Sequence, residues 1–171
     1  SPGDAGSSIG AAALVHKKKL KWKHPYLGYN INRDINPKDV VKELLKNKVC
    51  GVANGRAEFG PRALGNRSLL GDPRHDIKDT VNQIKKRERF RPFAPAVLAE
   101  CVADYFEQER ESPYMLIVAD VKHQRRNAIS VEDQDLFGID QLKLLRSDIP
   151  AVTHVDYSAR IQTVHRDTNP R

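Results

Sequence analysis

The 171-residue sequence contains only two cysteines, Cys50 and Cys101. They form no CxxC pair and have no histidine at metal-ligand spacing. Free thiols in apolar segments are typical of buried cysteines in a reducing compartment. No apolar run approaches the roughly 18 to 20 residues that a membrane span needs. The basic cluster at 16–23 follows the apolar stretch at 11–15, whereas a signal peptide has the reverse order. We therefore expect a cytoplasmic protein with no membrane partner.

Aromatic residues make up only 6% of the chain, and none interleaves with a basic run in the way of a single-strand RNA reader. The sequence also has no P-loop and no nucleophile–base pair. An enzyme with these absences would work by positioning and charge stabilisation of a phosphorylated substrate, not by covalent catalysis.

Positive charge is what the sequence has in excess. The formal net charge is +7, and residues 56–91 alone hold ten Lys or Arg against five acids. A field concentrated in this way implies an anionic partner. The charge by itself leaves open whether that partner is a nucleotide, a small phosphate or RNA.

The loop at 55–74 places four arginines between glycines. The arginines are Arg56, Arg62, Arg67 and Arg74, and the glycines are Gly55, Gly60, Gly65 and Gly71. Arginine grips phosphate oxygens in pairs, and glycine lets backbone N–H groups form an anion nest. Asn66 and Ser68 add neutral hydrogen-bonding groups. The pattern predicts phosphate binding, with a surface or RNA-facing loop as the alternative.

A second basic group follows, at Lys85, Arg87, Arg89 and Arg91. A solvated helix C-terminus explains Lys85, because basic residues complement the helix dipole there. It explains Arg91 poorly, because Arg91 lies in an apolar, proline-flanked run where an unpaired charge is costly. His154 and Arg160 could contact an anion, although a lone histidine at a strand end is more often structural.

Local signals predict alternating helices and strands. Asn36 as N-cap and Pro37 at the first helical position start a helix that Asn47 ends. Further helices are expected at 76–88 and 100–107, with a loop at 55–74 and strands or extended segments at 49–53, 96–98, 114–121, 151–155 and 161–164. This alternation favours the α/β (or α+β) class with a mixed sheet.

The block GRAEFGPRALGNRSLLGDPR (55–74) closely resembles the O-carbamoyltransferase family, which includes antibiotic and nodulation-factor carbamoyltransferases. Residues 84–100 and 150–164 resemble further blocks of the same family in the same order, and 3–12 resembles the end of its N-terminal domain. The resemblance implies a YrdC-like twisted mixed sheet with flanking helices over 37–171, truncated at its end. Residues 1–15 would be the tail of a sugar-kinase/actin-like domain, and 16–36 a linker.

The resemblance also implies a reaction. The YrdC-like domain would turn carbamoyl phosphate and ATP, with magnesium, into carbamoyl-adenylate. The other domain, with bound iron, would pass the carbamoyl group to a small hydroxylated acceptor. From the residue pattern and the resemblance together, the predicted catalytic residues are Arg62, Lys85 and Arg91, and the predicted substrate-binding residues are Arg56, Arg62, Asn66, Arg67, Ser68, Lys85, Arg87, Arg91, His154 and Arg160. Asp4 matches an aspartate that helps to hold the metal.

The sequence begins with Ser and ends without a closing element, so we expect a fragment that does not complete the overall transfer. A homodimer is compatible with the sequence. Two alternative functions stay open, namely a basic nucleic-acid-binding module of YrdC-like fold and a scaffold that binds nothing.

Overall fold

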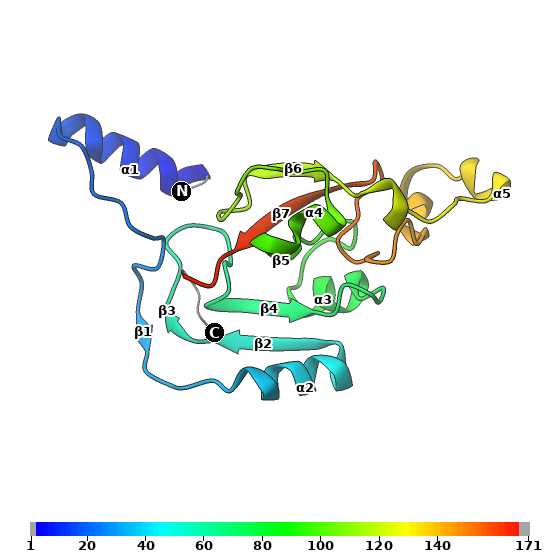
Figure 1. The fold of residues 1–171 in the computed structure, drawn as a ribbon, viewed down its shortest axis with the longest axis horizontal. Helices are drawn as coiled ribbons and strands as arrows, with labels where there is room; N and C mark the ends of the chain where they lie inside the picture. The colour runs from blue at the N-terminus through cyan, green and yellow to red at the C-terminus, as the bar shows by residue number, and fades with distance from the viewer. Residues whose placement is uncertain (1–2, 168–171) are drawn as a thin grey trace.

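The computed structural model of the chain describes residues 3–167, without the side chains of 3 and 4 (Figure 1). The helices are α1 (Gly3–His16), α2 (Pro37–Asn47), α3 (Lys78–Ile84), α4 (Val102–Tyr105) and α5 (Val131–Gln134), with 3-10 turns η1 (Ala99–Cys101), η2 (His123–Arg125) and η3 (Gly138–Lys143). The strands are β1 (Asn30–Ile31), β2 (Val49–Ala53), β3 (Gly55–Arg56), β4 (Arg67–Gly71), β5 (Ala96–Leu98), β6 (Ile117–Asp120) and β7 (Ser158–Val164).

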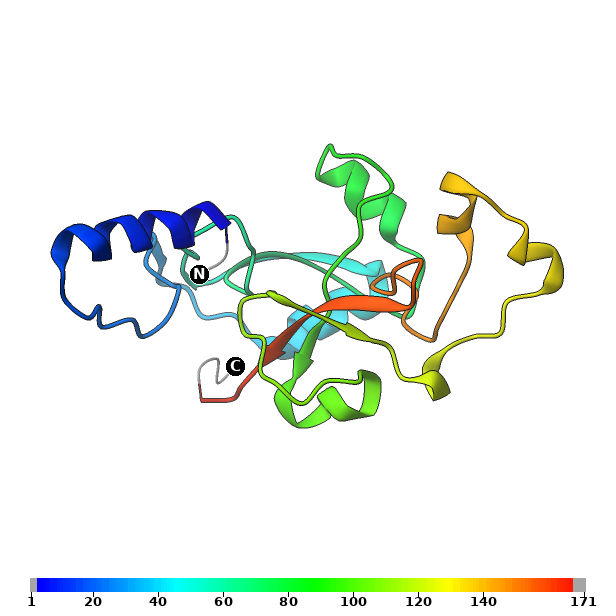
Figure 2. The same ribbon diagram turned by 90° about the horizontal axis from the view of Figure 1, so that it is seen from above.

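The largest sheet has three strands in the order β5-β7-β6, and β7 runs parallel to β5 and antiparallel to β6. Two antiparallel pairs, β2-β4 and β1-β3, complete the strands of the described chain. The α/β class with a mixed sheet is thereby confirmed. Both views show α1 and the segment around α5 projecting at opposite ends of the molecule (Figures 1 and 2).

The hydrophobic core lies on the three-stranded sheet. Phe106, Val121 and Ile161 are almost completely buried, and Ile77 and Val81 bring the start of α3 against the same cluster. The segment between β4 and β5 therefore packs against the core through the start of α3. This placement brings the basic residues that follow α3 close to β7.

The predicted helix at 37–47 is confirmed, and its boundaries have local causes. The Asn36 side chain accepts a hydrogen bond from the Lys38 N–H at 3.1 Å, and Pro37 occupies the first turn. The helix ends where Lys48 adopts a left-handed backbone (φ 65°) and its N–H bonds the Leu44 carbonyl oxygen at 2.8 Å. The predicted strand at 49–53 follows directly as β2.

The predicted elements at 55–74, 76–88 and 151–155 differ from the structure, and those at 100–107 and 114–121 are present but shorter, as α4 and β6. The strand predicted at 151–155 is wrong, because Ala151 and Val152 form a buried turn after Ile149; an apolar run signals burial and not strand geometry alone. Part of the predicted loop is strand β4. The predicted helix at 76–88 is shortened to 78–84, since Lys86 has a positive φ of 51° and the Arg87 N–H returns to the Asn82 carbonyl oxygen.

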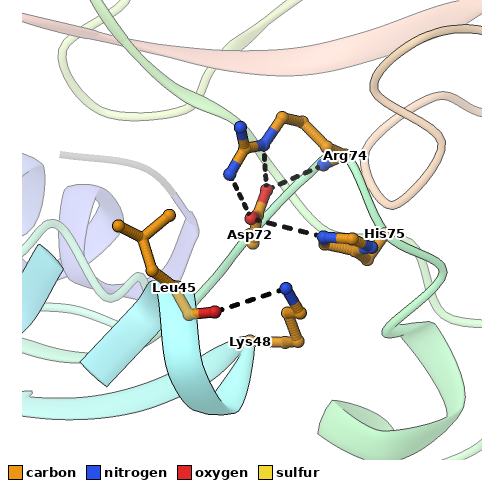
Figure 3. A network of polar contacts seen from close by, with 5 residues as sticks. All are labelled: Leu45, Lys48, Asp72, Arg74 and His75. Carbon is orange, nitrogen blue, oxygen red and sulfur yellow. Dashed lines mark hydrogen bonds and ion pairs between the residues drawn. The ribbon is translucent and has the colours of Figure 1, made fainter. Parts of the chain in front are cut away.

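Arg74, one of the four loop arginines, forms an ion pair within the protein (Figure 3). Its Nε and Nη2 donate to the two oxygens of the Asp72 carboxylate at 2.9 and 2.7 Å. Asp72 is only 6% exposed, and its own N–H bonds the Lys48 carbonyl oxygen at 2.8 Å. The hydrogen bond from Arg74 lowers the pKa of Asp72 from 3.8 to about 2. Arg74 therefore serves to close the turn between β4 and α3.

This lowered pKa predicts an acid-linked loss of stability. A carboxylate with a depressed folded pKa stabilises the fold above its unfolded pKa, and that contribution disappears as the pH falls from about 4 to about 2. The contribution at neutral pH is about 2 kcal/mol. Urea unfolding of the wild type and of Asp72→Asn should therefore differ in free energy at pH 7 and converge near pH 2. Parallel curves at all pH values would contradict this assignment.

Candidate anion-binding site

The loop that carries Arg62 is held by the carboxylate of Glu58. One oxygen of Glu58 accepts hydrogen bonds from the backbone N–H groups of Leu64, Asn66 and Arg67 at 2.7, 2.8 and 3.1 Å. The turn needs glycine at Gly65, whose φ is 115°. The anion nest expected in this loop exists, but the chain's own carboxylate fills it. Glu58 thus fixes the loop and leaves ligand binding to side chains.

Arg67 is also used inside the fold. Its guanidinium donates to the backbone carbonyl oxygens of Asn54, Tyr29 and Gly55 at 2.8, 3.0 and 3.2 Å. Asn66 similarly donates from its side-chain amide to the carbonyl oxygen of Arg56 at 2.8 Å. These bonds join the segments around β1, β3 and β4. The side chains of Arg67 and Asn66 therefore stabilise the loop through hydrogen bonds within the protein.

The basic segment after α3 depends on a completely buried asparagine. The Asn82 side chain donates to the carbonyl oxygens of Arg89 and Arg91, both at 3.0 Å, and accepts a hydrogen bond from Nε of Arg87. The Arg87 guanidinium also lies over the Phe93 ring, 4.7 Å from its centroid. Asn82 therefore sets the path of the chain from 85 to 91 and orients Arg87.

The contacts of Glu58 and Asn82 position Arg62, Lys85 and Arg87 around one hollow, which Arg160 of β7 also lines and which we call the cation pocket. It has a volume of about 200 Å³. Its polar lining consists of Arg62, Ser68, Lys85, Arg87, Arg160 and Gln162, and its apolar lining includes Leu69, Phe93, Ala96 and Met115. The described lining contains no Asp or Glu, so the positive charge is not neutralised within the pocket.

The positive charges in the pocket repel one another, so each disfavours the charged form of its neighbours. Burial lowers the pKa of Arg160, and the neighbouring Arg62 and Arg87 lower it further. Burial lowers the pKa of Lys85 as well, with a contribution from Arg87. Within residues 3–167, the side chains of Arg62 and Arg160 make no hydrogen bond or ion pair, and the Nε of each is buried without an acceptor. Partly buried cations without a counter-ion are unfavourable, so an anion in the pocket would stabilise this arrangement.

Of the residues expected in the site, the structure brings together Arg62, Ser68, Lys85, Arg87 and Arg160. Arg56 lies exposed on β3, outside the pocket. Arg91 is half-exposed, pairs with Glu88 at 3.1 Å and does not line the pocket. His154 lines a neighbouring cavity. Asp4 lies in the first turn of α1, and its side chain is outside the described part.

The surroundings of His154 disfavour its charged form. Burial lowers its pKa below 6.5, and Nδ1 lies 3.0 Å from the Ser158 hydroxyl oxygen. That hydroxyl donates to the Asp156 carboxylate at 2.7 Å, so Nδ1 of His154 must be the donor to Ser158. The histidine is therefore held in a single tautomer.

Sequence reasoning missed Glu58 and Asn82. Glu58 is one of two acids among the loop arginines, and Asn82 is a polar residue beside Val81 on the buried side of α3. Within the described residues, no group of three or more His, Cys, Asp or Glu is arranged to hold a metal ion. No helix in the same part of the chain is long and apolar enough to cross a membrane.

The segments that line the cation pocket fall within a stretch that matches a known protein family. Residues 41–171 match the family model described as "Carbamoyltransferase C-terminus". The chain belongs to this family, and the resemblance seen in the sequence is thereby confirmed.

Relatives of known name make the placement more specific. The chain is 46% identical to the Synechocystis protein sll1178, with 99% of the chain aligned to 33% of that protein. It is 43% identical to nodulation protein NolO of Bradyrhizobium diazoefficiens over 71% of the chain and 20% of the relative. It is 36% identical to nodulation protein U of Rhizobium tropici over 98% of the chain and 28% of the relative. The chain thus spans about a third or less of the length of these relatives.

Proposed function

We propose that this chain is the part of an O-carbamoyltransferase that binds carbamoyl phosphate and ATP and forms carbamoyl-adenylate. The observation that carries the proposal is the cation pocket, where Arg62 and Arg160 have no anionic partner within the described residues. Membership of the carbamoyltransferase family supports it. Magnesium would accompany ATP, as it usually does.

The pocket supplies positioning and charge stabilisation for this chemistry. Water cleaves carbamoyl phosphate to carbamate and inorganic phosphate. A carbamate oxygen then bonds to the α-phosphorus of ATP, the bond to the bridging oxygen breaks, and pyrophosphate leaves with the electron pair. Negative charge is thereby redistributed over phosphate oxygens, which arginine forks stabilise well.

Transfer to a small hydroxylated acceptor would need the remainder of a full-length protein. The predicted iron site would have Asp4 as one ligand, and its other ligands would come from outside the described residues. We derive no step through that metal. The predicted domain boundaries at 15 and 36, the cytoplasmic location and a homodimer likewise stay predictions.

Isothermal titration of the chain with freshly dissolved carbamoyl phosphate tests the proposal. We expect saturable binding with a dissociation constant on the order of millimolar or tighter, which weakens only modestly with salt. A nucleic-acid-binding module would instead bind single-stranded RNA with a steep salt dependence. A scaffold would bind neither, and no ligand would shift its melting temperature. Either of these two outcomes would refute the proposal.

A further inference from the structure

A separate hollow lies in the segment 122–149, for which the sequence predicts no role. Its volume is about 500 Å³, and its lining includes His123, Arg126, Ile129, Gln134 and Tyr157. We call it the Arg126 cavity. Gln134 comes from α5, which belongs to the part of the chain that projects from the molecule in both views (Figures 1 and 2). None of the lining residues also lines the cation pocket, so the two hollows are distinct.

The Arg126 guanidinium is anchored through one nitrogen and leaves the other two for a ligand. Its Nε donates to the Val121 carbonyl oxygen at 2.8 Å, and Val121 is completely buried in the core. The guanidinium carbon also lies 4.9 Å from the centroid of the Tyr157 ring. Among residues 3–167, neither Nη atom of Arg126 makes a hydrogen bond or an ion pair. The side chain is therefore held in place while its terminal N–H groups lack an acceptor.

No acid of the described lining neutralises this positive charge, because that lining contains neither Asp nor Glu. Asn127 lines the cavity too, but its amide donates to the carbonyl oxygens of Leu145 and Ser147 at 2.7 and 3.3 Å and so closes the base of the projecting segment. His123 and Gln134 add exposed polar groups to the wall. The cavity thus offers one permanent cation among neutral or basic neighbours.

Acids do occur nearby in the sequence, on α5. Glu132, Asp133 and Asp135 flank Gln134, but none of them lines the cavity. Within residues 3–167, none of the three forms an ion pair with Arg126. The α5 carboxylates therefore do not act as the counter-ion of this arginine.

Tyr157 holds its ring against the guanidinium with a strained backbone. Its φ is 64°, a conformation that aromatic residues rarely adopt and that glycine adopts without strain. The conformation is fixed from both sides, since the Tyr157 N–H donates to the His154 carbonyl oxygen at 3.1 Å and its own carbonyl oxygen accepts from the Val121 N–H at 2.9 Å. Strain that a large side chain retains indicates that the side chain is used.

We propose that the Arg126 cavity binds a small molecule through an oxyanion, either a phosphate or a carboxylate group. The planar guanidinium matches such a group with two parallel N–H donors. Ile129 and the Tyr157 ring provide apolar surface for the rest of the molecule. The volume falls within the roughly 300 to 1,000 Å³ of typical small-molecule sites. This site is additional to the proposed carbamoyl phosphate site and does not depend on it.

NMR titration of the nitrogen-labelled chain tests the proposal, with inorganic phosphate and malonate as separate probes. We expect the amide signals of 123–129 and 157 to shift saturably, with half-saturation at or below about 10 mM for at least one probe. Signals are assigned by residue, so any phosphate in the cation pocket is observed separately. Tighter binding of phosphate identifies a phosphate group as the natural anchor, and tighter binding of malonate identifies a carboxylate.

Variants decide whether Arg126 binds the anion or serves only the fold. Arg126→Met should weaken the response of 123–129 by about tenfold or more and leave the signals around Arg160 responding as in the wild type. Tyr157→Gly, whose backbone is unstrained at this φ, should stay folded and weaken binding by about threefold or more, so the test holds even where Arg126→Met fails to fold. Arg110→Met is the matched control, because Arg110 is exposed and has no ion pair among residues 3–167.

Two results would overturn the proposal. One is half-saturation above about 10 mM, or no saturable shift at all, for both probes in the wild type. The other is an affinity in Tyr157→Gly and in folded Arg126→Met equal to that of Arg110→Met, because Arg126 would then only support the chain through Val121.

Discussion

Replacing Arg160 with methionine should lower the affinity for carbamoyl phosphate by roughly 30- to 100-fold and leave the melting temperature unchanged or higher. The two effects have different causes. The variant removes a charged donor from the cation pocket, and hydrogen bonds to charged groups are worth about 1.5–3 kcal/mol. It also relieves the free protein of a partly buried cation that lies near Arg62 and Arg87.

A lower affinity together with an unchanged or higher melting temperature distinguishes a ligand-binding arginine from a structural one. Calorimetric titration gives the affinity, and thermal unfolding without ligand gives the stability. Arg89→Met is the matched control, because the Arg89 side chain is 79% exposed and, among residues 3–167, makes only a long contact of 3.8 Å to Asp79. A melting temperature that falls by several degrees in Arg160→Met, or an equal loss of affinity in Arg89→Met, would mean that Arg160 serves the fold.

Replacing Asn82 with leucine should lower the free energy of unfolding by roughly 3–5 kcal/mol. Leucine has a similar volume, so the loss comes from hydrogen bonds and not from a cavity. The change leaves Nε of Arg87 and the carbonyl oxygens of Arg89 and Arg91 without their partner. The segment with Lys85 and Arg87 then loses its anchor, and carbamoyl phosphate affinity should fall with the stability.

Urea unfolding of Asn82→Leu against the wild type measures this effect. Gln83→Leu is the control, because Gln83 is the neighbouring residue of α3 and faces solvent. A loss below about 1 kcal/mol in Asn82→Leu would show that the three hydrogen bonds contribute little.

Elements with local causes were predictable from the sequence. The Asn36 cap and Pro37 were enough to predict where α2 begins. The early end of the helix predicted at 76–88 was not predictable, because the apolar periodicity gives no sign of the positive φ of Lys86. The buried turn at 151–153 was read as a strand because its exposure depends on packing against distant segments. Periodicity reports which residues are apolar and not what covers them.

The site was likewise predictable only in part. Family resemblance and the choice of arginine pointed to Arg62, Lys85 and Arg87, which do meet. The roles of Glu58 and Asn82 depend on hydrogen bonds to backbone groups. The sequence does not show where those backbone groups lie in space. Arg126 comes from a segment without any recognisable pattern, so only the fold reveals its place at a cavity.

The carboxylate of Glu58 has a consequence for how a ligand arrives. Its three hydrogen bonds hold the turn that bears Arg62 in one conformation before any anion is present. Encounter then requires no slow rearrangement of the main chain, and little conformational entropy is lost on association. The binding surface is preorganised, so the lifetime of the complex, and not its rate of formation, is the quantity that substitutions in the pocket would change most.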